Sequence, residues 1–348
     1  MMKNNNPVKR DILLEMKDIV IDGFSDDRWH PIIKGIDLTL CRGEVLGLIG
    51  ESGAGKSTLG KAAMGFAQPG CRLTGGTILF DGMELRAKSE KEKQKLWGSR
   101  MAYVAQSAAA SFNPAHRLID QTTESGIRHG LMSRKDAESD AIELYKAMRL
   151  PDPSNIGFRY PHQVSGGQLQ RAMTAMAMTS RPDLIIFDEP TTALDVTTQV
   201  EVLAAMRDAV ERFNTAAIYI THDLAVVAQM SDRIKVLRFG EEMEEAETNK
   251  MLKSPSHPYT KSLWSVRSIE KKATSSDDKI LEIRNVDAAY GKGPKVLQNV
   301  NISVPRGNTV AIVGESGSGK STAARVITGL LPVLKGKVLF NNEPLTLM

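Results

Sequence analysis

Glycine-rich loops that end in lysine and a hydroxyl residue bind phosphate groups, and the 348-residue sequence contains such a loop. The loop consists of Gly50, Glu51, Ser52, Gly53, Ala54, Gly55, Lys56, Ser57 and Thr58. Its glycines allow consecutive backbone N–H groups to point at phosphate oxygens, and a following helix adds the positive end of its dipole. Lys56 is expected to reach the β- and γ-phosphates, and the Ser57 hydroxyl to coordinate Mg²⁺. A chance glycine-rich turn is disfavoured, because an apolar run precedes the loop and a helix-forming run follows it.

Two adjacent carboxylates could hold Mg²⁺ and activate a water, which a phosphate-binding loop needs for hydrolysis. Asp188 and Glu189 directly follow the apolar run 184–187, which predicts a buried strand. In parallel α/β sheets, ligands bind beyond the carboxyl ends of the strands. One carboxylate can hold Mg²⁺, and the other can orient and deprotonate an attacking water. Alone, this pair before Pro190 is equally typical of a solvated turn, but together with the loop it predicts a hydrolytic site.

A second anion-attracting helix start lies upstream of the carboxylates. Ser165, Gly166, Gly167 and Gln168 precede the helix-forming stretch 169–178, which is rich in alanine and methionine. A serine followed by two glycines at a helix start favours anion binding. By itself such a tetrapeptide is more often only a helix cap, and we expect the helix that follows to pack in the core.

The elements that must position these residues can be predicted from apolar runs and helical spacing. Short apolar runs at 45–49, 184–187, 217–220 and 310–313 predict buried strands. Helical spacing is found at 134–149 and 198–213. Strands that alternate with helices indicate an α/β fold with a mainly parallel sheet.

The phosphate loop occurs twice. Its second copy includes Gly314, Gly319, Lys320, Ser321 and Thr322. The stretch between the copies is polar around residues 271–279 and is predicted to be a linker. We therefore predict a complete domain at 1–270, a linker at 271–279 and a shortened second domain at 280–348, which has the loop but none of the later motifs.

Composition limits the possible functions. Lys and Arg number 45 against 41 Asp and Glu, and the net charge of +4 is too small over this length to indicate nucleic-acid binding. Cys41 and Cys71 lack the spacing of a zinc site or a disulfide framework. Because no apolar run approaches the ~18–20 residues of a transmembrane helix, any membrane role is expected to be peripheral. The polar first residues lack the apolar stretch of a secretory signal.

The ordered set of motifs resembles the ATP-binding-cassette (ABC) ATPases. The matching segments are Walker A at Gly50–Ser57, the Q-loop at Gln106, Ser165–Gln168, Walker B at Asp188 with Glu189, the D-loop at Ala193–Asp195 and the H-loop at Ile220–Asp223. The resemblance implies a P-loop NTPase with a RecA-like parallel sheet core, an antiparallel β subdomain and a helical subdomain, followed by a partial second cassette. ATP and Mg²⁺ are the implied cofactors.

The same resemblance implies roles for single residues. Glu189, His222 and Gln106 are the implied catalytic residues, and His222 is implied to contact the γ-phosphate. The implied ligands of Mg²⁺ are Ser57, Asp188 and Gln106, and Gln106 is also an implied ligand of the attacking water. Phe24 and Tyr290 lie where the family stacks an aromatic ring on adenine, although a core aromatic is nearly as good an interpretation. Two cassettes of this family pair head to tail, so that Ser165–Gln168 of one closes on ATP in the other.

Three local segments resemble the oligopeptide, dipeptide and nickel importer branch of the family. They are Tyr160–Gln163, Ser111–Pro114 and the "HPYT" tail Ser254–Thr260. This implies an ATP-hydrolysing subunit at the cytoplasmic face of a bacterial inner membrane. Its implied partners are integral-membrane permease subunits, which dock on the region 108–147, and indirectly a solute-binding protein. The acidic run Glu241–Glu245, where the family has a hairpin, is expected to be a solvated sheet edge.

A non-transport ABC ATPase acting on nucleic acid or the ribosome is the alternative. The short spacing between Walker A and Ser165, and the two cysteines, disfavour its chromosome and repair types. The second copy resembles part of a fused double-cassette importer, so we predict that hydrolysis requires another complete cassette, in a homodimer or with a partner ATPase. The transported solute and the identity of the permease stay open.

Overall fold

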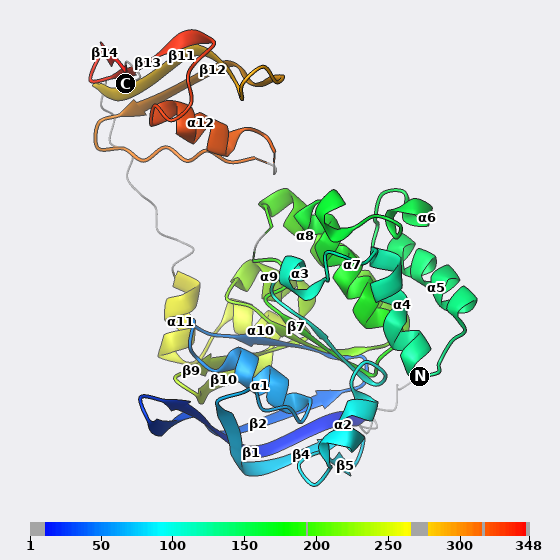
Figure 1. Cartoon of the computed structure of the whole chain (residues 1–348). Coiled ribbons are helices and arrows are strands. Elements are labelled where there is room, and N and C mark those ends of the chain that lie inside the picture. Colours follow the sequence, from blue (N-terminus) through cyan, green and yellow to red (C-terminus); the bar gives the residue numbers. More distant parts are fainter. Residues whose placement is uncertain (1–10, 193, 266–277, 315–316, 346–348) are drawn as a thin grey trace, which may run out of the picture. The chain divides into compact units, whose positions relative to one another are not determined.

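The computed structural model describes residues 11–192, 194–265, 278–314 and 317–345 (Figure 1). The chain divides into two compact units, one of residues 1–194 and 199–267 and one of residues 195–198 and 268–348. The predicted linker lies mostly outside the described residues, so the predicted boundaries at 270 and 279 stay predictions.

Two sheets form the first unit. The strands are β1 (Ile12–Ser25), β2 (Arg28–Cys41), β3 (Val45–Ile49), β4 (Cys71–Phe80), β5 (Met83–Glu84), β6 (Met101–Val104), β7 (Leu184–Asp188), β8 (Ala216–Ile220), β9 (Arg233–Arg238) and β10 (Glu241–Glu247). One sheet is antiparallel, with the order β2-β1-β4-β5. The other has the order β10-β9-β3-β8-β7-β6 and is parallel except at its β10 edge.

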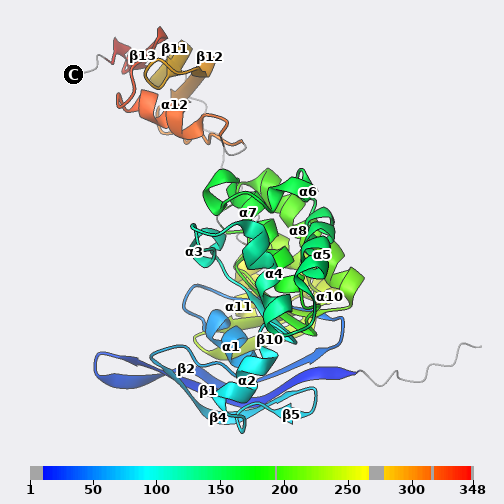
Figure 2. The ribbon, with the colours of Figure 1, turned by 45° about the vertical axis from the view of Figure 1, so that its right-hand side comes forward.

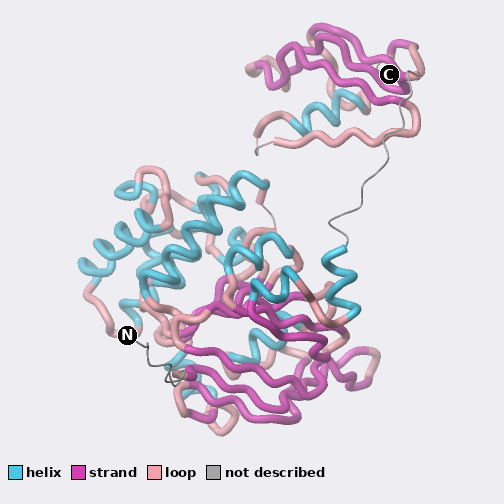
Figure 3. The backbone as a smooth tube through the Cα atoms, turned by 180° about the vertical axis from the view of Figure 1, so that it is seen from behind, coloured by secondary structure: helices cyan, strands magenta, loops and turns pink. Residues whose placement is uncertain are grey.

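The first unit also contains helices. They are α1 (Lys56–Ala63), α2 (Glu90–Leu96), α3 (Ala108–Ser111), α4 (Leu118–Arg128), α5 (Arg134–Ala147), α6 (Pro153–Ile156), α7 (Gly166–Met178), α8 (Val196–Phe213), α9 (Leu224–Met230), α10 (Thr248–Lys253) and α11 (Pro258–Ser265). Helix α1 packs between the two sheets, while α4, α5, α7 and α8 lie over the opposite face of the six-stranded sheet (Figures 1 and 3). The β1–β2 hairpin extends past the other strands of its sheet (Figure 2).

The register of the parallel strands brings the motif residues to one edge. Strand β3 lies between β8 and β9, and β7 pairs with β8 so that Asp188 is opposite Ile220. Loops that follow β3, β7 and β8 therefore leave the sheet at the same carboxyl edge. The predicted strands at 45–49, 184–187 and 217–220 and the predicted helices at 134–149 and 198–213 are confirmed, with small shifts at their ends.

The acidic run forms the sheet edge that we expected: strand β10 is an edge strand, and Glu241 and Glu242 are exposed there. The carboxylates of this strand also form ion pairs. The Lys235 side chain is only 2% exposed, and its Nζ contacts Glu242 and lies 2.5 Å from Glu245 Oε2. A buried ammonium group requires such partners, because an unpaired charge in the interior is costly.

The second unit repeats part of the first. It contains β11 (Lys279–Ala289), β12 (Lys295–Pro305), α12 (Lys320–Ile327), β13 (Lys335–Phe340) and β14 (Glu343–Pro344). Its sheet order, β12-β11-β13-β14, matches the antiparallel sheet of the first unit. The predicted buried strand at 310–313 is wrong, since these residues form no strand and Val313 is 86% exposed. In the described part of this unit no strand lies on either side of the segment to complete its hydrogen bonds.

Among the described residues, no helix has the length and apolar character that crossing a membrane requires.

Candidate nucleotide-hydrolysis site

The phosphate loop connects β3 to α1 and depends on two glycines. Gly50 has φ 153°, and a Cβ there would lie 2.2 Å from the carbonyl oxygen of Leu237. Gly55 precedes α1 with φ 92°, and a Cβ there would lie 2.5 Å from Ile33 Cδ1. Side chains at either position would collide with the packed sheet, so the loop conformation requires glycine.

Lys56, the first residue of α1, is folded back into the loop. Its Nζ donates to the carbonyl oxygens of Gly50 at 2.8 Å and Glu51 at 2.9 Å, and the residue is 5% exposed. Burial lowers the pKa of Lys56, and the nearby carboxylates of Glu189 and Asp188 oppose that shift. A cation held in this way can exchange backbone carbonyls for phosphate oxygens with little reorganisation.

Asp188 ends β7 and receives two hydroxyl hydrogen bonds. The Ser57 Oγ donates to Asp188 Oδ1 at 2.7 Å, and the Tyr103 hydroxyl donates to Asp188 Oδ2 at 2.5 Å. Tyr103 belongs to β6, which pairs with β7. Burial and the hydrogen bond to Asp188 raise the pKa of Tyr103 well above its usual range, so the hydroxyl stays a donor. Sequence reasoning did not identify Tyr103.

Three polar side chains converge on Glu189. Gln106 Nε2 donates to Oε2 at 3.2 Å, Thr192 Oγ1 donates to the same oxygen at 3.2 Å, and His222 Nδ1 lies 3.3 Å from Oε1. The backbone of Glu189 has φ 47°, a region that residues other than glycine rarely adopt. This conformation is held by a hydrogen bond from Glu189 N–H to the carbonyl oxygen of Ile220. The structure thus assembles Gln106, Glu189 and His222, predicted from separate motifs, and adds Thr192.

A cavity of about 410 Å³ joins the loop to the carboxylates. Its described lining residues are Ile32, Ser52, Gly53, Gly55, Lys56, Ser57, Thr58, Gln106, Asp188 and Glu189. All of these except Ile32 were predicted from motifs. The cavity is lined by a cation and two carboxylates, which suits a polyphosphate and an attacking water.

The donors in this cavity fit a Mg²⁺ ion. Among the described residues, no group of three or more His, Cys, Asp or Glu is arranged to hold a metal ion. Ser57 and Asp188 nevertheless place a hydroxyl and a carboxylate oxygen 2.7 Å apart on the cavity wall. Mg²⁺ prefers such oxygens and completes its shell with waters and substrate phosphates, so a small protein ligand set is sufficient.

The Ser165–Gln168 segment forms a capped helix start outside this cavity. Ser165 Oγ accepts from Gln168 N–H at 3.3 Å, and Gln168 Oε1 accepts from Ser165 N–H at 3.1 Å. Gly166 and Gly167 open α7. None of the four residues is among the described lining residues. Ala193 of the predicted D-loop lies outside the described residues.

The two predicted adenine-stacking aromatics lie in different surroundings. Phe24 is 50% exposed and packs on Trp29 across the β1–β2 hairpin, with ring centroids 5.2 Å apart. It is not among the described lining residues of the cavity. Tyr290 instead faces α12, and its hydroxyl lies 3.3 Å from Thr322 Oγ1 and accepts from Arg325 at 3.0 Å. Trp29, which no motif indicated, is therefore an aromatic partner of Phe24.

The second phosphate loop reproduces one contact of the first. Lys320 Nζ donates to the carbonyl oxygen of Gly314 at 2.8 Å, as Lys56 does to Gly50. Gly314 and Gly319 have φ 153° and 95°, close to the values of Gly50 and Gly55. Ser321 is exposed and Thr322 is buried, while residues 315 and 316 lie outside the described residues.

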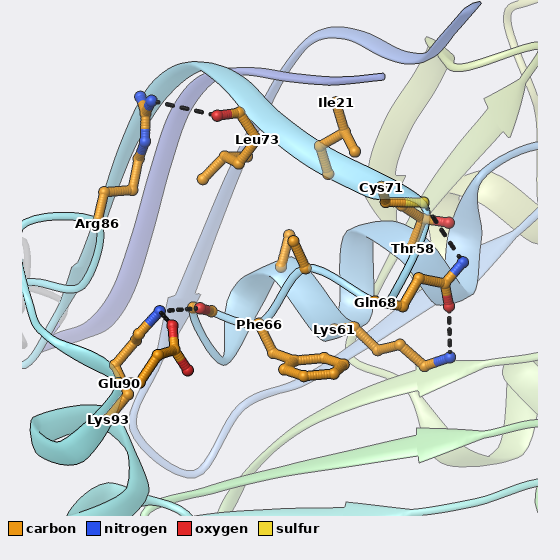
Figure 4. A pocket seen from close by; sticks show the side chains of 13 residues that line it. Ile21, Thr58, Lys61, Phe66, Gln68, Cys71, Leu73, Arg86, Glu90 and Lys93 are labelled. Atoms are coloured by element: carbon orange, nitrogen blue, oxygen red, sulfur yellow. Dashed lines mark hydrogen bonds and ion pairs between the residues drawn. The ribbon is translucent and has the colours of Figure 1, made fainter. Parts of the chain in front are cut away.

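A neighbouring cavity of about 350 Å³ lies at the other end of α1 (Figure 4). Its basic residues are held by chain atoms: Lys61 Nζ donates to Gln68, and Lys93 Nζ to the carbonyl oxygen of Gly65. Arg86 donates to the carbonyl oxygens of Gly76 and Leu73. The cations of this cavity are therefore engaged by the protein itself.

Comparisons with known proteins agree with this geometry. The ABC transporter family matches residues 33–192 and 297–347. A probable peptide ABC transporter ATP-binding protein, y4tR of Sinorhizobium fredii, is 35% identical over 82% of this chain and 85% of its own. The oligopeptide transport ATP-binding protein OppD of Lactococcus lactis subsp. cremoris is 38% identical over 76% of this chain and 78% of its own.

A longer relative and a solved structure extend the comparison. The glutathione import ATP-binding protein GsiA of Escherichia coli is 31% identical over 95% of this chain, which spans only 60% of the length of that relative. A dimeric bacterial ABC transporter cassette, MJ0796, is 25% identical with a TM-score of 0.60, over 68% of this chain and 98% of that chain.

Proposed function

The chain belongs to the ABC transporter family, and we propose that it is the ATP-hydrolysing subunit of an importer of peptides or similar small solutes. The relatives named for peptide, oligopeptide and glutathione import support the importer assignment. No observation on the site favours the alternative, a non-transport ATPase acting on nucleic acid or the ribosome.

The convergence of Gln106, Thr192 and His222 on Glu189, beside the cavity that Lys56 lines, is the observation that carries this function. Lys56 binds the terminal phosphates of ATP, and Glu189 orients and deprotonates the attacking water. Gln106 and His222 hold the Glu189 carboxylate in place. Ser57, Asp188 and Gln106 are the proposed ligands of Mg²⁺, which would neutralise charge on the phosphates when bound.

We propose that the active form contains two cassettes. Ser165 and its helix start are outside the cavity that Lys56 lines, and in this proposal the same segment of a second cassette closes over the ATP. The partner is either a second copy of this chain or a partner ATPase. Lys320 and the second loop bind phosphate in this proposal, while hydrolysis takes place at the first loop.

The proposed location is the cytoplasmic face of a bacterial inner membrane. Helices α3, α4 and α5, within residues 108–147, form the proposed docking region for integral-membrane permease subunits. A solute-binding protein is an indirect partner, and no nucleic-acid partner is proposed. Recovery of an integral permease with the tagged chain from membranes supports this assignment, and recovery of nucleic acid or ribosomes in its place contradicts it.

The dependence of ATP hydrolysis on protein concentration tests the catalytic proposal. The rate per chain should rise with concentration as cassettes pair. Glu189→Gln should lower the rate by ~10²–10⁴-fold and accumulate an ATP-bound dimer on a sizing column. Glu211→Gln, which alters an exposed carboxylate on α8, is the matched control and should behave as wild type. A wild-type chain that hydrolyses no ATP at any concentration, either alone or with a partner ATPase recovered from membranes, would refute the proposal. A Glu189→Gln chain that forms no ATP-bound dimer under either condition would refute it as well.

A further inference from the structure

The HPYT tail is a sequence motif to which the hydrolytic site assigns no role. It follows α10 and leads into α11, which begins at Pro258. Proline suits the first position of a helix, because it has no N–H to leave unpaired there. The helix start brings Tyr259 toward the first unit's sheet.

A carboxylate from the acidic run holds this tail against the sheet. Glu244 Oε1 accepts from the backbone N–H of Ser256 at 2.7 Å, and Glu244 Oε2 accepts from that of His257 at 3.0 Å. His257 Nδ1 then accepts from the N–H of Tyr259 at 3.2 Å. The position of Tyr259 is therefore set by hydrogen bonds on the residues before it, as well as by packing.

The Tyr259 side chain lies in a buried cluster beside the phosphate loop. It is 6% exposed and shares this cluster with Ile49, the last residue of β3, and with Val236 and Met251. The guanidinium group of Arg238 lies 4.6 Å from its ring centroid. The hydroxyl accepts a hydrogen bond from the backbone N–H of Glu51 at 3.4 Å.

One peptide group is thereby held from both sides. The N–H of Glu51 and the C=O of Gly50 belong to the same planar peptide unit and point in opposite directions. The N–H donates to the Tyr259 hydroxyl, and the C=O accepts from Lys56 Nζ at 2.8 Å. Rotation of this peptide would break both contacts, so the tail tyrosine and the loop lysine fix its orientation together.

We propose that Tyr259 is a positioning residue of the phosphate loop: through the Gly50–Glu51 peptide it keeps Lys56 in the orientation that receives ATP. Tyr259 touches neither phosphate nor water in this proposal, so its effect is on nucleotide affinity and not on the chemical step. The inference rests on the proposed ATP site. Because a 3.4 Å hydrogen bond is long, we expect a moderate effect.

Tyr259→Phe tests this role with little change in packing. We expect a two- to fivefold rise in the Kd for ATP and in KM, with kcat changed by less than twofold. Tyr145→Phe is the matched control, because it also removes a buried hydroxyl hydrogen bond, to Thr122 at 2.7 Å, but in the helical region. It should leave the Kd for ATP unchanged.

Amide hydrogen exchange at Glu51 gives a second readout, independent of turnover. The Glu51 N–H should exchange faster in Tyr259→Phe than in wild type and at the wild-type rate in Tyr145→Phe. An unchanged Kd for ATP in Tyr259→Phe, or equal losses in both variants, would overturn the inference. A wild-type chain that binds no ATP would instead defeat the proposed function, and the exchange rate of Glu51 would still decide whether Tyr259 holds the loop.

Discussion

The Tyr103 hydroxyl donates to Asp188 Oδ2 at 2.5 Å, while the Ser57 hydroxyl donates to the other oxygen, Oδ1. Asp188 is 7% exposed, and both of its oxygens thus have hydroxyl donors from the protein. The two contacts define the rotation of the carboxylate before any ligand arrives. Tyr103 therefore orients a proposed Mg²⁺ ligand without being a ligand itself.

Tyr103→Phe should weaken the response to Mg²⁺. Losing one hydrogen bond that orients the Asp188 carboxylate costs about 1–2 kcal/mol, so the Mg²⁺ concentration for half-maximal ATP hydrolysis should rise about five- to thirtyfold. ATP binding measured without Mg²⁺ should change less. A Mg²⁺ titration of the purified variant against Tyr145→Phe checks this, and superimposable titration curves would count against an orienting role.

The two phosphate loops should respond differently to loss of their lysine. Lys56→Met should raise the Kd for ATP more than tenfold at the hydrolytic site and abolish turnover. Because burial lowers the pKa of Lys56, its charged form is disfavoured by the fold, and the variant should stay folded with little change in Tm. Lys320→Met is the matched change in the second loop and should leave turnover within twofold of wild type. Equal losses of turnover in both variants would assign hydrolysis to both loops.

Uninterrupted apolar runs in the sequence predicted those strands that are buried on both faces of the sheet. Such strands are apolar throughout, which is why 45–49, 184–187 and 217–220 were identifiable. The same reasoning failed at 310–313, because an apolar run becomes a strand only when neighbouring strands complete its hydrogen bonds. In the first unit those neighbours, β8 and β9, come from far along the chain.

Some residues of the site could be predicted from local sequence motifs, whereas others are brought to it only by contacts between distant parts of the chain. Gln106, Glu189 and His222 belong to motifs with recognisable order, and the structure brings them together. Tyr103 gave no such signal, and the HPYT motif that contains Tyr259 indicated a branch of the family but no contact with the phosphate loop. A single tyrosine has no spacing pattern, and the contact from Tyr259 to Glu51 joins residues 208 positions apart. The contact of Tyr103 with Asp188 depends on the pairing of β6 with β7. The contact of Tyr259 with Glu51 depends on the anchoring of the tail by Glu244.

Substitutions at Ser165 can separate its helix cap from its proposed role at a second cassette. Asp, Asn and Ser are similarly good N-caps, so Ser165→Asp and Ser165→Asn should both keep the stability of α7 within about 0.5 kcal/mol. Ser165→Asp adds a negative charge where the partner's ATP phosphates are proposed to bind. It should prevent formation of the ATP-bound dimer in the Glu189→Gln background, whereas Ser165→Asn should permit it. Dimer formation by both double variants on a sizing column would place Ser165 away from the nucleotide.

The anchoring of the tail by Glu244 should depend on pH. Partial burial opposes ionisation of this carboxyl, but hydrogen bonds from the N–H groups of Ser256 and His257 outweigh it, so its pKa in the folded chain is lowered from 4.5. The folded state therefore favours the ionised form. Its stabilising contribution is complete above pH ~4.5, the pKa range of an unfolded glutamate, and is lost as the pH falls through the lower pKa of the folded state.

The protection of the Ser256 and His257 amides against hydrogen exchange between pH 6 and pH 3 measures this anchoring. The exchange rates are first corrected for the intrinsic pH dependence of exchange. Protection should fall about fivefold across this range in wild type, which corresponds to about 1 kcal/mol for a partly exposed carboxylate. Glu244→Gln should show the reduced protection already at pH 6, with a flat profile below it. Since Tyr259 is held by the same segment, this variant should also raise the Kd for ATP at neutral pH. A Glu244→Gln profile that still falls with acid would identify another titrating group as the anchor.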